Sequence, residues 1–192
     1  ANNTLLALQI SATNEIANLA TKIKNIDISD VMHGVHLDRR WNPLINNNRI
    51  NPGILKYLEA GCGFGGSCFP KDVKAITNFA SEIGYRMNIS ESILKVNENQ
   101  PSIIVNQLEE NIIIKNSTIL VLGLSFKEDT DDIRESPSLI IINQLISKGA
   151  KVIASDPKSI NNFKKNIKSN PNLKYTEHWE LAIKDSDAIV LV

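Results

Sequence analysis

The hydrophobic pattern of the chain changes its period between residues 111 and 117, and this change constrains the fold more than any other feature. Before it, apolar residues recur three and four apart, which is the spacing of helices that bury one face. After it, short runs of β-branched residues alternate with helical segments. That alternation predicts a parallel sheet with right-handed crossovers. We therefore expect an α/β protein, with an all-helical domain at 1–112 and a partial Rossmann-like domain at 113–192.

The helical part predicts a series of amphipathic helices interrupted by polar loops. Residues 38–52 contain two prolines and three consecutive asparagines, a composition typical of an irregular loop. Pro101 lies inside a helical pattern, where it is expected to kink the helix or to mark a junction. The expected helices run from about Asn3 to Lys24, from a start at 27–29, from Lys71 to Ile83, and from about Ile89 to Leu108.

The second part predicts alternating strands and helices. Ser136-Pro137 is a helix start, and Gly149 ends that helix after Lys148. The first expected turn, 123–127, is not G-x-G-x-x-G and gives no direct support for dinucleotide binding. The expected strands are Thr118–Leu124, Lys151–Ser155, Leu173–Tyr175 and 187–192, with a further helix around His178–Lys184.

A glycine-rich string leads into a cysteine and then a proline: Gly61-Cys62-Gly63-Phe64-Gly65-Gly66-Ser67-Cys68-Phe69-Pro70-Lys71-Asp72. Pro70 suits the first turn of a helix, so Cys68 is expected at a helix N-terminus. The helix end and the nearby Lys71 both stabilise a thiolate. Asp72 is near enough to act on whatever Cys68 attacks. A buried packing cysteine or a disulfide with Cys62 is the competing interpretation, whereas the lack of further ligands argues against zinc.

Composition excludes several classes of partner. Acidic and basic residues balance at 21 each, so no net field attracts nucleic acid or an anionic membrane. The longest apolar runs are too short to span a bilayer. Two cysteines without a pairing framework indicate a reducing compartment, and we expect a cytoplasmic protein. The chain begins without Met and ends on an apparent buried strand, so we expect a fragment of a longer protein.

The string from Gly63 to Asp72 resembles the nucleophile motif of the UDP-glucose/GDP-mannose dehydrogenase family. Two further segments agree in order. The segment Ala1-Asn2-Asn3 with Ile10-Ser11 and Asn14-Glu15 is similar to the start of the family's central helical domain. The segment from Leu122 through Lys127 to Arg134-Glu135-Ser136-Pro137 is similar to the start of its UDP-binding domain. The resemblance spans nearly the whole chain and implies a central dimerisation domain followed by a UDP-sugar-binding domain.

The resemblance also implies roles for individual residues. Cys68 would be the catalytic nucleophile, Asp72 would assist proton transfer or orient water, and Asn3 would hydrogen-bond the reacting oxygen. A plain N-cap of the first helix is the competing interpretation for Asn3. Four residues would bind the substrate: Arg49, acting on the sugar nucleotide of a dimer partner, Phe64, Gly65 and Lys127.

Arg134 would contact the NAD cofactor. Without the resemblance, Lys127 and Arg134 would be interpreted as part of a solvated acidic loop, because four acidic residues surround them. The segment after Arg49 departs from the family pattern, since Asn51-Pro52 replaces the usual glycine. No metal site is expected: His33 and His36 lie three apart without a third ligand.

The implied activity is the NAD-dependent oxidation of the primary alcohol of a UDP-sugar to a carboxylate, through a thiohemiacetal and a thioester on Cys68. A homodimer formed through the helical domain is expected. The resemblance covers neither the family's N-terminal Rossmann domain nor that domain's G-x-G-x-x-G loop, so the fragment alone is expected to be inactive. Two alternatives remain open: a non-enzymatic dimerisation and nucleotide-binding module, and a cysteine hydrolase, which would need a histidine near Cys68.

Overall fold

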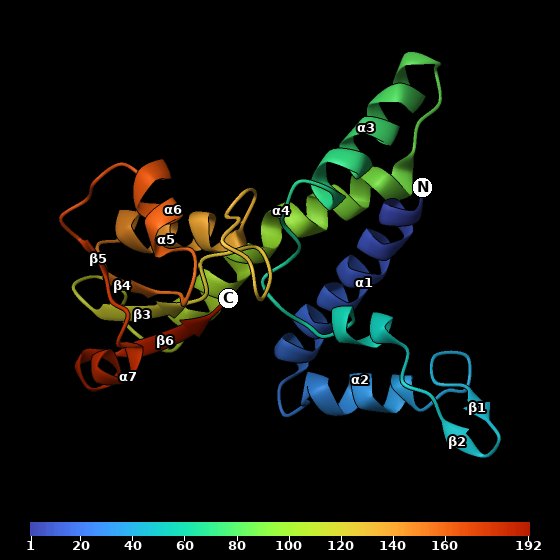
Figure 1. The fold of residues 1–192 in the computed structure, drawn as a ribbon, viewed down its shortest axis with the longest axis horizontal. Coiled ribbons are helices and arrows are strands. Elements are labelled where there is room, and N and C mark those ends of the chain that lie inside the picture. Colours follow the sequence, from blue (N-terminus) through green and yellow to red (C-terminus); the bar gives the residue numbers. More distant parts are fainter.

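The computed structural model describes residues 1–192 and has a helical part and a sheet part connected by one long helix (Figure 1). The helical part contains α1 (Asn2–Ile23), α2 (Ile28–His36), α3 (Phe69–Glu82) and α4 (Asn88–Glu109), with a short 3₁₀ helix at Gly53–Tyr57. Asp27 caps α2 by accepting a hydrogen bond from the N–H of Ser29. None of the helices combines the length and the apolar character needed to cross a bilayer.

Helix α1 does not bury the face that its apolar spacing predicts, which is the stripe at Leu5, Leu8, Ala12, Ile16, Leu19 and Ile23. The buried residues are mainly small or polar and include Ala7, Asn14 and Ala17. Leu5 and Leu19 of the stripe are instead 61% and 60% exposed. Small side chains allow α1 to lie close to α3 and α4, against which it packs. Ile10 is buried, but Leu5, Ile16, Leu19 and Ile23 face outward and are left uncovered in a single chain.

The loop expected at 38–52 contains a small hairpin. Strands β1 (Leu44–Ile45) and β2 (Asn48–Arg49) pair antiparallel. Asn46 and Asn47 between them both have positive φ, at 49° and 60°. Two such residues form the tight turn that matches strand twist, and asparagine tolerates this conformation. The asparagine run is thus a hairpin turn rather than irregular chain, and the helical domain is not strictly all-helical.

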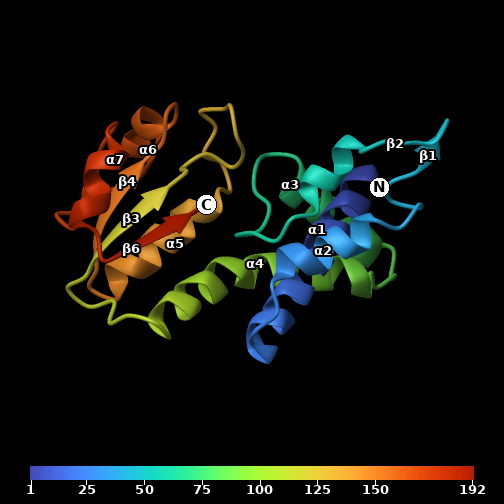
Figure 2. The same cartoon turned by 90° about the horizontal axis from the view of Figure 1, so that it is seen from below.

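Helix α4 runs through Pro101 as one helix, so the expected junction does not occur there. Proline provides no N–H for the carbonyl of Asn97, but α4 packs against both α1 and α5. Figure 2 shows α4 reaching from the helical part to the underside of the sheet part. The proposed boundary at 112–113 falls between the end of α4 and the first strand of the sheet.

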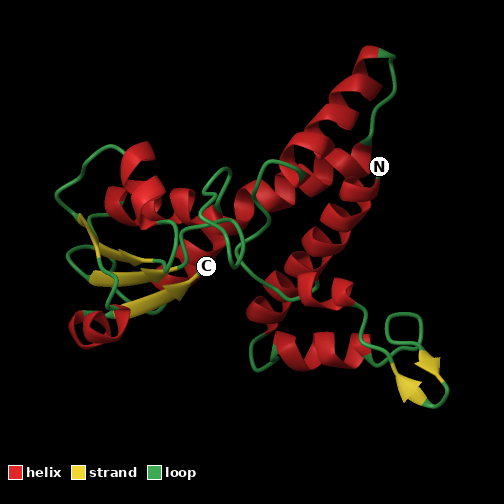
Figure 3. Ribbon diagram, in the orientation of Figure 1, coloured by secondary structure: helices red, strands yellow, loops and turns green.

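The sheet part contains a four-stranded parallel sheet in the order β5-β4-β3-β6. Its strands are β3 (Thr118–Leu122), β4 (Lys151–Ser155), β5 (Leu173–Tyr175) and β6 (Ala188–Leu191). The helices are α5 (Pro137–Ser147), α6 (Ile160–Asn166) and α7 (Trp179–Ala182), with a 3₁₀ turn at Ile183–Asp185. Figure 3 shows the strands gathered in this part of the molecule. The alternation read from the sequence is confirmed, and β3 ends two residues earlier than expected.

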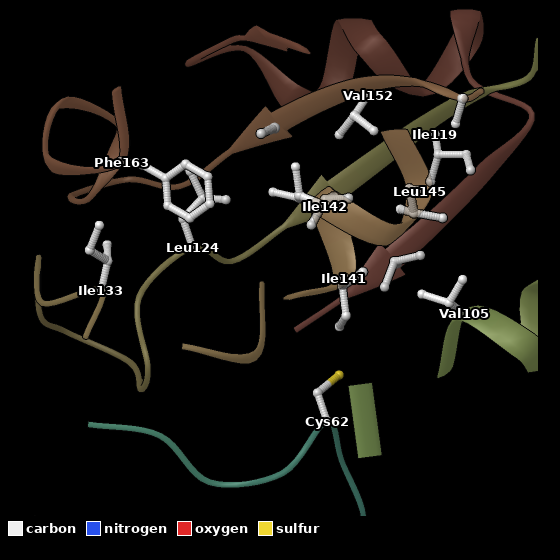
Figure 4. Close-up of a cluster of buried hydrophobic side chains, with 14 of the residues drawn as sticks. Cys62, Val105, Ile119, Leu124, Ile133, Ile141, Ile142, Leu145, Val152 and Phe163 are labelled. Carbon is white, nitrogen blue, oxygen red and sulfur yellow. The ribbon is translucent and has the colours of Figure 1, made fainter. Parts of the chain in front are cut away.

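The core of the sheet part includes residues from outside it. Phe163, Ile141 and Leu145 are fully buried around β3 and β4. Val105 of α4 and Cys62 of the glycine loop belong to the same cluster, and Figure 4 shows Cys62 beside a segment of α4 at its edge. The two parts therefore share a hydrophobic core, which fixes the glycine loop relative to the sheet.

Candidate active site

Cys68 lies at the N-cap position of α3 and is exposed. Pro70 stands in the first turn of the helix, as the sequence predicts. The hydroxyl of Ser67 lies 3.8 Å from the Cys68 sulfur. The first turn of a helix presents N–H groups without intrahelical partners, and they favour negative charge at this end. The arrangement therefore suits a thiolate that is open to an electrophile.

Cys62 has the opposite environment. Its Sγ is buried, lies 3.6 Å from the carbonyl oxygen of Leu191, and forms no disulfide with Cys68. Burial raises the pKa of the Cys62 thiol to about 11. At neutral pH this thiol stays protonated and is a poor nucleophile. Of the two cysteines, only Cys68 is placed for chemistry.

Asp72 lies one helical turn after Cys68 and contacts Asn3 of α1. The amide Nδ2 of Asn3 donates to Asp72 Oδ2 at 2.7 Å. The ammonium of Lys71 lies 3.3 Å from the other carboxylate oxygen. The hydrogen bond from Asn3 and then Lys71 hold the pKa of Asp72 below its ordinary value. The structure thus brings Asn3 against Asp72, which follows Cys68 by one helical turn, although Asn3 and Asp72 lie 69 residues apart in the sequence.

Asn3 does not cap its helix. The N-cap of α1 is Ala1, and Asn3 stands inside the first turn with its side chain directed to α3. The capping interpretation of Asn3 is therefore wrong, because the amide is used across helices. A side-chain amide held beside a carboxylate can still donate its second N–H to a bound oxygen.

A cavity of about 450 Å³ lies where the C-terminal edge of the sheet meets the glycine loop. We call it the Lys127 cavity. Parallel sheets bind ligands at this edge. The Lys127 ammonium lies 5.6 Å from the centre of the Phe126 ring. Residues of both parts line the cavity, among them Cys62, Gly63, Ser125, Phe126, Lys127 and Lys158.

The first turn of the sheet is already occupied by a protein carboxylate. Asp156 Oδ2 accepts from the N–H groups of Leu124, at 2.8 Å, and Ser125, at 3.3 Å. In a dinucleotide-binding Rossmann turn such N–H groups would face a pyrophosphate. Here they satisfy a buried aspartate. The sheet part therefore does not offer the usual phosphate cradle for NAD.

A second cavity, of about 660 Å³, lies on the other side of the glycine loop. Its lining includes Lys71, Lys74 and Arg134, so we call it the Arg134 cavity. The guanidinium of Arg134 pairs with Asp132 at 2.6 Å. The pKa of Arg134 is raised by Asp132 and, to a smaller degree, by nearby Cys68. Arg134 thus lies near Cys68. The three cations of this cavity suit an anionic group, although Arg134 and Lys71 are already paired with Asp132 and Asp72.

The glycine loop is pressed against the segment that carries Arg134. The N–H of Gly66 donates to the carbonyl oxygen of Arg134 at 2.9 Å. A Cβ on Gly65 would overlap the carbonyl oxygen of Glu135, and one on Gly66 would lie 2.7 Å from the Phe126 ring. The glycines are therefore required by contact between the two parts, and Gly65 lies against protein.

Two predicted substrate-binding residues stand away from both cavities. The Phe64 side chain is 7% exposed, and its ring packs edge-on against Phe69 at 5.8 Å among buried residues of α1, α3 and α4. Its ring therefore does not line a pocket. Arg49 lies on the projecting hairpin, where Nη1 donates to the carbonyl of Leu37. Within one chain it does not approach Cys68.

Three amide side chains that we did not predict hold the glycine loop in place. Asn14 of α1 bonds Gly61, and Asn97 and Gln100 of α4 bond the backbone of the loop. In the sequence, each of these amides can be recognised only as a polar residue on a helix face that also carries buried apolar residues. That signal indicates burial but does not name the partner.

His33 and His36 line a separate cavity beside Glu59. No group of three or more His, Cys, Asp or Glu side chains is arranged to hold a metal ion.

The fold and the site define a class: a helical domain and a parallel α/β domain that share a glycine loop, whose residues line two cavities and which leads to an exposed cysteine. The chain belongs to the UDP-glucose/GDP-mannose dehydrogenase family, whose central domain matches residues 1–99 and whose UDP binding domain matches residues 120–192.

Two similar relatives are UDP-glucose 6-dehydrogenases. The chain is 35% identical to YwqF of Bacillus subtilis over 193 residues, which cover 100% of the chain and 40% of the relative. It is 37% identical to the enzyme of Rickettsia bellii, over 99% of the chain and 41% of the relative. The chain thus spans about 40% of the length of the curated relatives that it matches.

A solved structure agrees with the fold. The UDP-glucose dehydrogenase of the archaeon Pyrobaculum islandicum superposes with a TM-score of 0.85 at 34% identity, covering 100% of the chain and 41% of that protein. The arrangement of the helical part and the sheet is therefore the arrangement found in this family.

Proposed function

We propose that the chain is the central and UDP-binding portion of an NAD-dependent UDP-glucose-type 6-dehydrogenase. The observation that carries the proposal is the exposed Cys68 at the start of α3, with the Asn3–Asp72 pair one turn away. The relatives named as UDP-glucose 6-dehydrogenases support this choice of substrate. The chain itself would supply the nucleophile, its proton-handling partners and part of the sugar-nucleotide site.

In the proposed reaction the substrate's primary alcohol becomes a carboxylate in two oxidations. NAD, when bound, accepts a hydride in each of them. After the first, the Cys68 sulfur adds to the aldehyde carbon and a proton is taken up by the former carbonyl oxygen. After the second, the sulfur carries an acyl group. Water then attacks the acyl carbon, the thiolate leaves and the acid is released.

Asp72 and Asn3 would act on oxygen in these steps. Because the pKa of Asp72 is lowered, the carboxylate is ionised at neutral pH and can orient the attacking water or accept its proton. Asn3 would donate to the oxygen that gains negative charge when sulfur or water adds. Both side chains are already held by their mutual hydrogen bond, so little reorganisation is needed.

The substrate would occupy the Lys127 cavity. The ammonium of Lys127 would bind phosphate or sugar oxygens, and Gly65 would contribute by letting the glycine loop lie against the backbone of Glu135. Phe64 would contribute by anchoring the loop through its buried ring. Arg134 would face the cofactor, and the other cations of the Arg134 cavity fit an anionic group there. Since the backbone N–H groups of the sheet turn are already bonded to Asp156, we propose that this chain alone does not oxidise the substrate.

We also propose a homodimer formed through the helical part. The outward apolar face of α1 supports it, as do Phe79 and Ile83 of α3, which are also exposed. Arg49 on its projecting hairpin would then reach the sugar nucleotide of the partner. Two free cysteines support a reducing location, and we propose the cytoplasm.

The test is an assay of the family-length protein that contains this chain, with NAD and a panel of nucleotide sugars. We expect UDP-glucose to be oxidised to the acid and Cys68→Ser to form no acid, because an alkoxide is far harder to generate than a thiolate. Acid production by Cys68→Ser at the wild-type rate would overturn the covalent mechanism. Binding of UDP without oxidation of any sugar would instead favour a non-enzymatic module.

A further inference from the structure

The glycine loop that leads to Cys68 begins in a pair of buried amides. The N–H of Gly61 donates to Asn14 Oδ1 at 2.9 Å, and its carbonyl oxygen accepts from Gln100 Nε2 at 3.0 Å. Asn14 and Gln100 are 1% and 2% exposed. Both polar groups of one loop residue are therefore satisfied by side chains from two different helices.

Asn97 of α4 forms two hydrogen bonds with the loop at Phe64, three residues after Gly61. Its Oδ1 accepts from the N–H of Phe64 at 2.7 Å, and its Nδ2 donates to the carbonyl oxygen of Phe64 at 2.9 Å. Gly63 has φ of 100°, and a Cβ there would lie 2.7 Å from Asn97 Oδ1. An amide side chain carries both a donor and an acceptor, so it can replace a missing strand partner for one peptide.

Helix α4 connects these contacts to the sheet. Asn97 and Gln100 lie one turn apart, and Val105 of the same helix is buried in the core of the sheet part. The loop itself reaches that core through Cys62. One continuous helix thus holds the loop and carries the domain that forms the opposite wall of the Lys127 cavity.

We infer that Asn97 and Gln100 are positioning residues for Cys68: their amides fix the backbone of the glycine loop so that Gly63 and Cys68 keep one arrangement across the cleft. The inference rests on the proposed function of Cys68. Backbone groups in an irregular loop beside a cavity need partners, and water would otherwise compete for them. A loop held by fixed amides is preorganised, which is what attack on a bound aldehyde requires.

A test independent of turnover uses Cys62 as a reporter. Cys62 is only 9% exposed and its thiol pKa is raised to about 11, so it should react slowly with iodoacetamide until the loop leaves the core, whereas Cys68 is already exposed. In Asn97→Ala we expect the alkylation rate of Cys62 to rise at least about tenfold, because two hydrogen bonds that oppose local opening are lost. Mass spectrometry of the two cysteine peptides resolves the sites. The rate at Cys68 should change less than about twofold.

Two controls separate positioning from general stability. Asn99→Ala alters an exposed asparagine of the same helix and should leave the Cys62 rate unchanged. Phe163→Leu weakens the sheet core without touching the amides. If Asn97→Ala raises the Cys62 rate more than Phe163→Leu at equal loss of thermal stability, the effect is local. Equal Cys62 rates in Asn97→Ala and Asn99→Ala would overturn the inference.

The second arm measures turnover of the family-length protein. Positioning predicts that Asn97→Ala lowers kcat for the nucleotide sugar at least about tenfold per folded molecule, whereas a purely stabilising role leaves kcat unchanged. An unchanged kcat would therefore contradict the inference even if Cys62 becomes more reactive. If the wild-type protein oxidises no nucleotide sugar, the proposed function fails. The Cys62 rates would then still decide whether the amides hold the loop.

Discussion

At the scale of single residues, the site depends on side chains that satisfy one another before any ligand arrives. Asn3 and Asp72 are bonded to each other, and Asp156 accepts from four backbone N–H groups of its neighbours. Such groups keep their charge and orientation because the surrounding donors are fixed. Two predictions test this at individual carboxylates.

Replacing Asn3 with Ala should raise the pKa of Asp72. The wild-type carboxyl has a lowered pKa, first because Asn3 donates to it and second because Lys71 is near. Without the amide, the pKa should move up towards the ordinary value of about 3.9. NMR titration of the Asp72 side-chain carbon measures it. Asn2→Ala is the matched control, and an Asp72 titration that is the same in both variants would contradict the role of Asn3.

Asp156→Asn should destabilise the protein by about 2–3 kcal/mol at pH 7, because an amide cannot accept all of the hydrogen bonds made to the carboxylate. Burial opposes the charge of Asp156, but backbone hydrogen bonds from Leu124, Lys158 and Ser159 outweigh it and lower the pKa.

The contribution of Asp156 is therefore fully present above the ordinary carboxyl pKa and is lost as the pH falls through the lowered folded-state pKa. Urea unfolding at several pH values should show the gap between wild type and Asp156→Asn closing in acid. Asp185→Asn, at an exposed position, should show no such gap. A gap that stays constant down to the acid limit would count against this account.

At the scale of elements, the glycine loop is shaped by what lies on both sides of it. Amides of α1 and α4 hold one side, and the segment that carries Arg134 presses on the other. The hairpin of β1 and β2 shows the same principle in a simpler form, since two asparagines with positive φ make its turn.

Gly65→Ala should destabilise the protein by about 1–3 kcal/mol, because the added methyl group overlaps the backbone of Glu135. Gly34→Ala is the matched substitution. Nothing lies within 4 Å of a Cβ at Gly34 inside α2, so alanine there should stabilise by up to about 1 kcal/mol. Urea midpoints compare the two, and a Gly65→Ala protein as stable as Gly34→Ala would remove the case for tight contact between the two parts.

At the scale of the whole molecule, one helix organises the two parts and one face remains uncovered. Helix α4 contributes Val105 to the core of the sheet part and Ile93 to a second buried cluster, in the helical part. The outer face of α1 exposes four large apolar side chains, Leu5, Ile16, Leu19 and Ile23, and a contiguous exposed apolar patch often marks an interaction surface.

The chain should sediment as a dimer at micromolar concentration, twice its mass of 21.3 kDa, because two-fold pairing would bury the exposed stripe of both copies. Leu19→Glu should give a monomer, since it places a charge in the stripe. Leu181→Glu, at an exposed leucine of α7, should remain a dimer. A wild-type protein that sediments as a monomer would contradict the proposed interface and the action of Arg49 across subunits.

The sequence by itself determined most of the elements and the position of the candidate nucleophile. Periodicity located most helices and strands, and Ser136-Pro137 located the start of α5. The motif around Cys68 placed the thiol at a helix N-terminus. These features are local, because period, caps and turns depend on residues only a few positions apart.

Tertiary structure alone decided which side chains meet. Asn3 bonds Asp72, which lies 69 residues away in the sequence, and Asn97 bonds Phe64, which lies 33 residues away. It also decided that Phe64 is buried, that the apolar stripe of α1 faces outward and that α4 passes through Pro101 without ending. Each outcome depends on how helices pack against one another. Helical periodicity predicts which side chains share a face, but it does not predict which other element will cover that face.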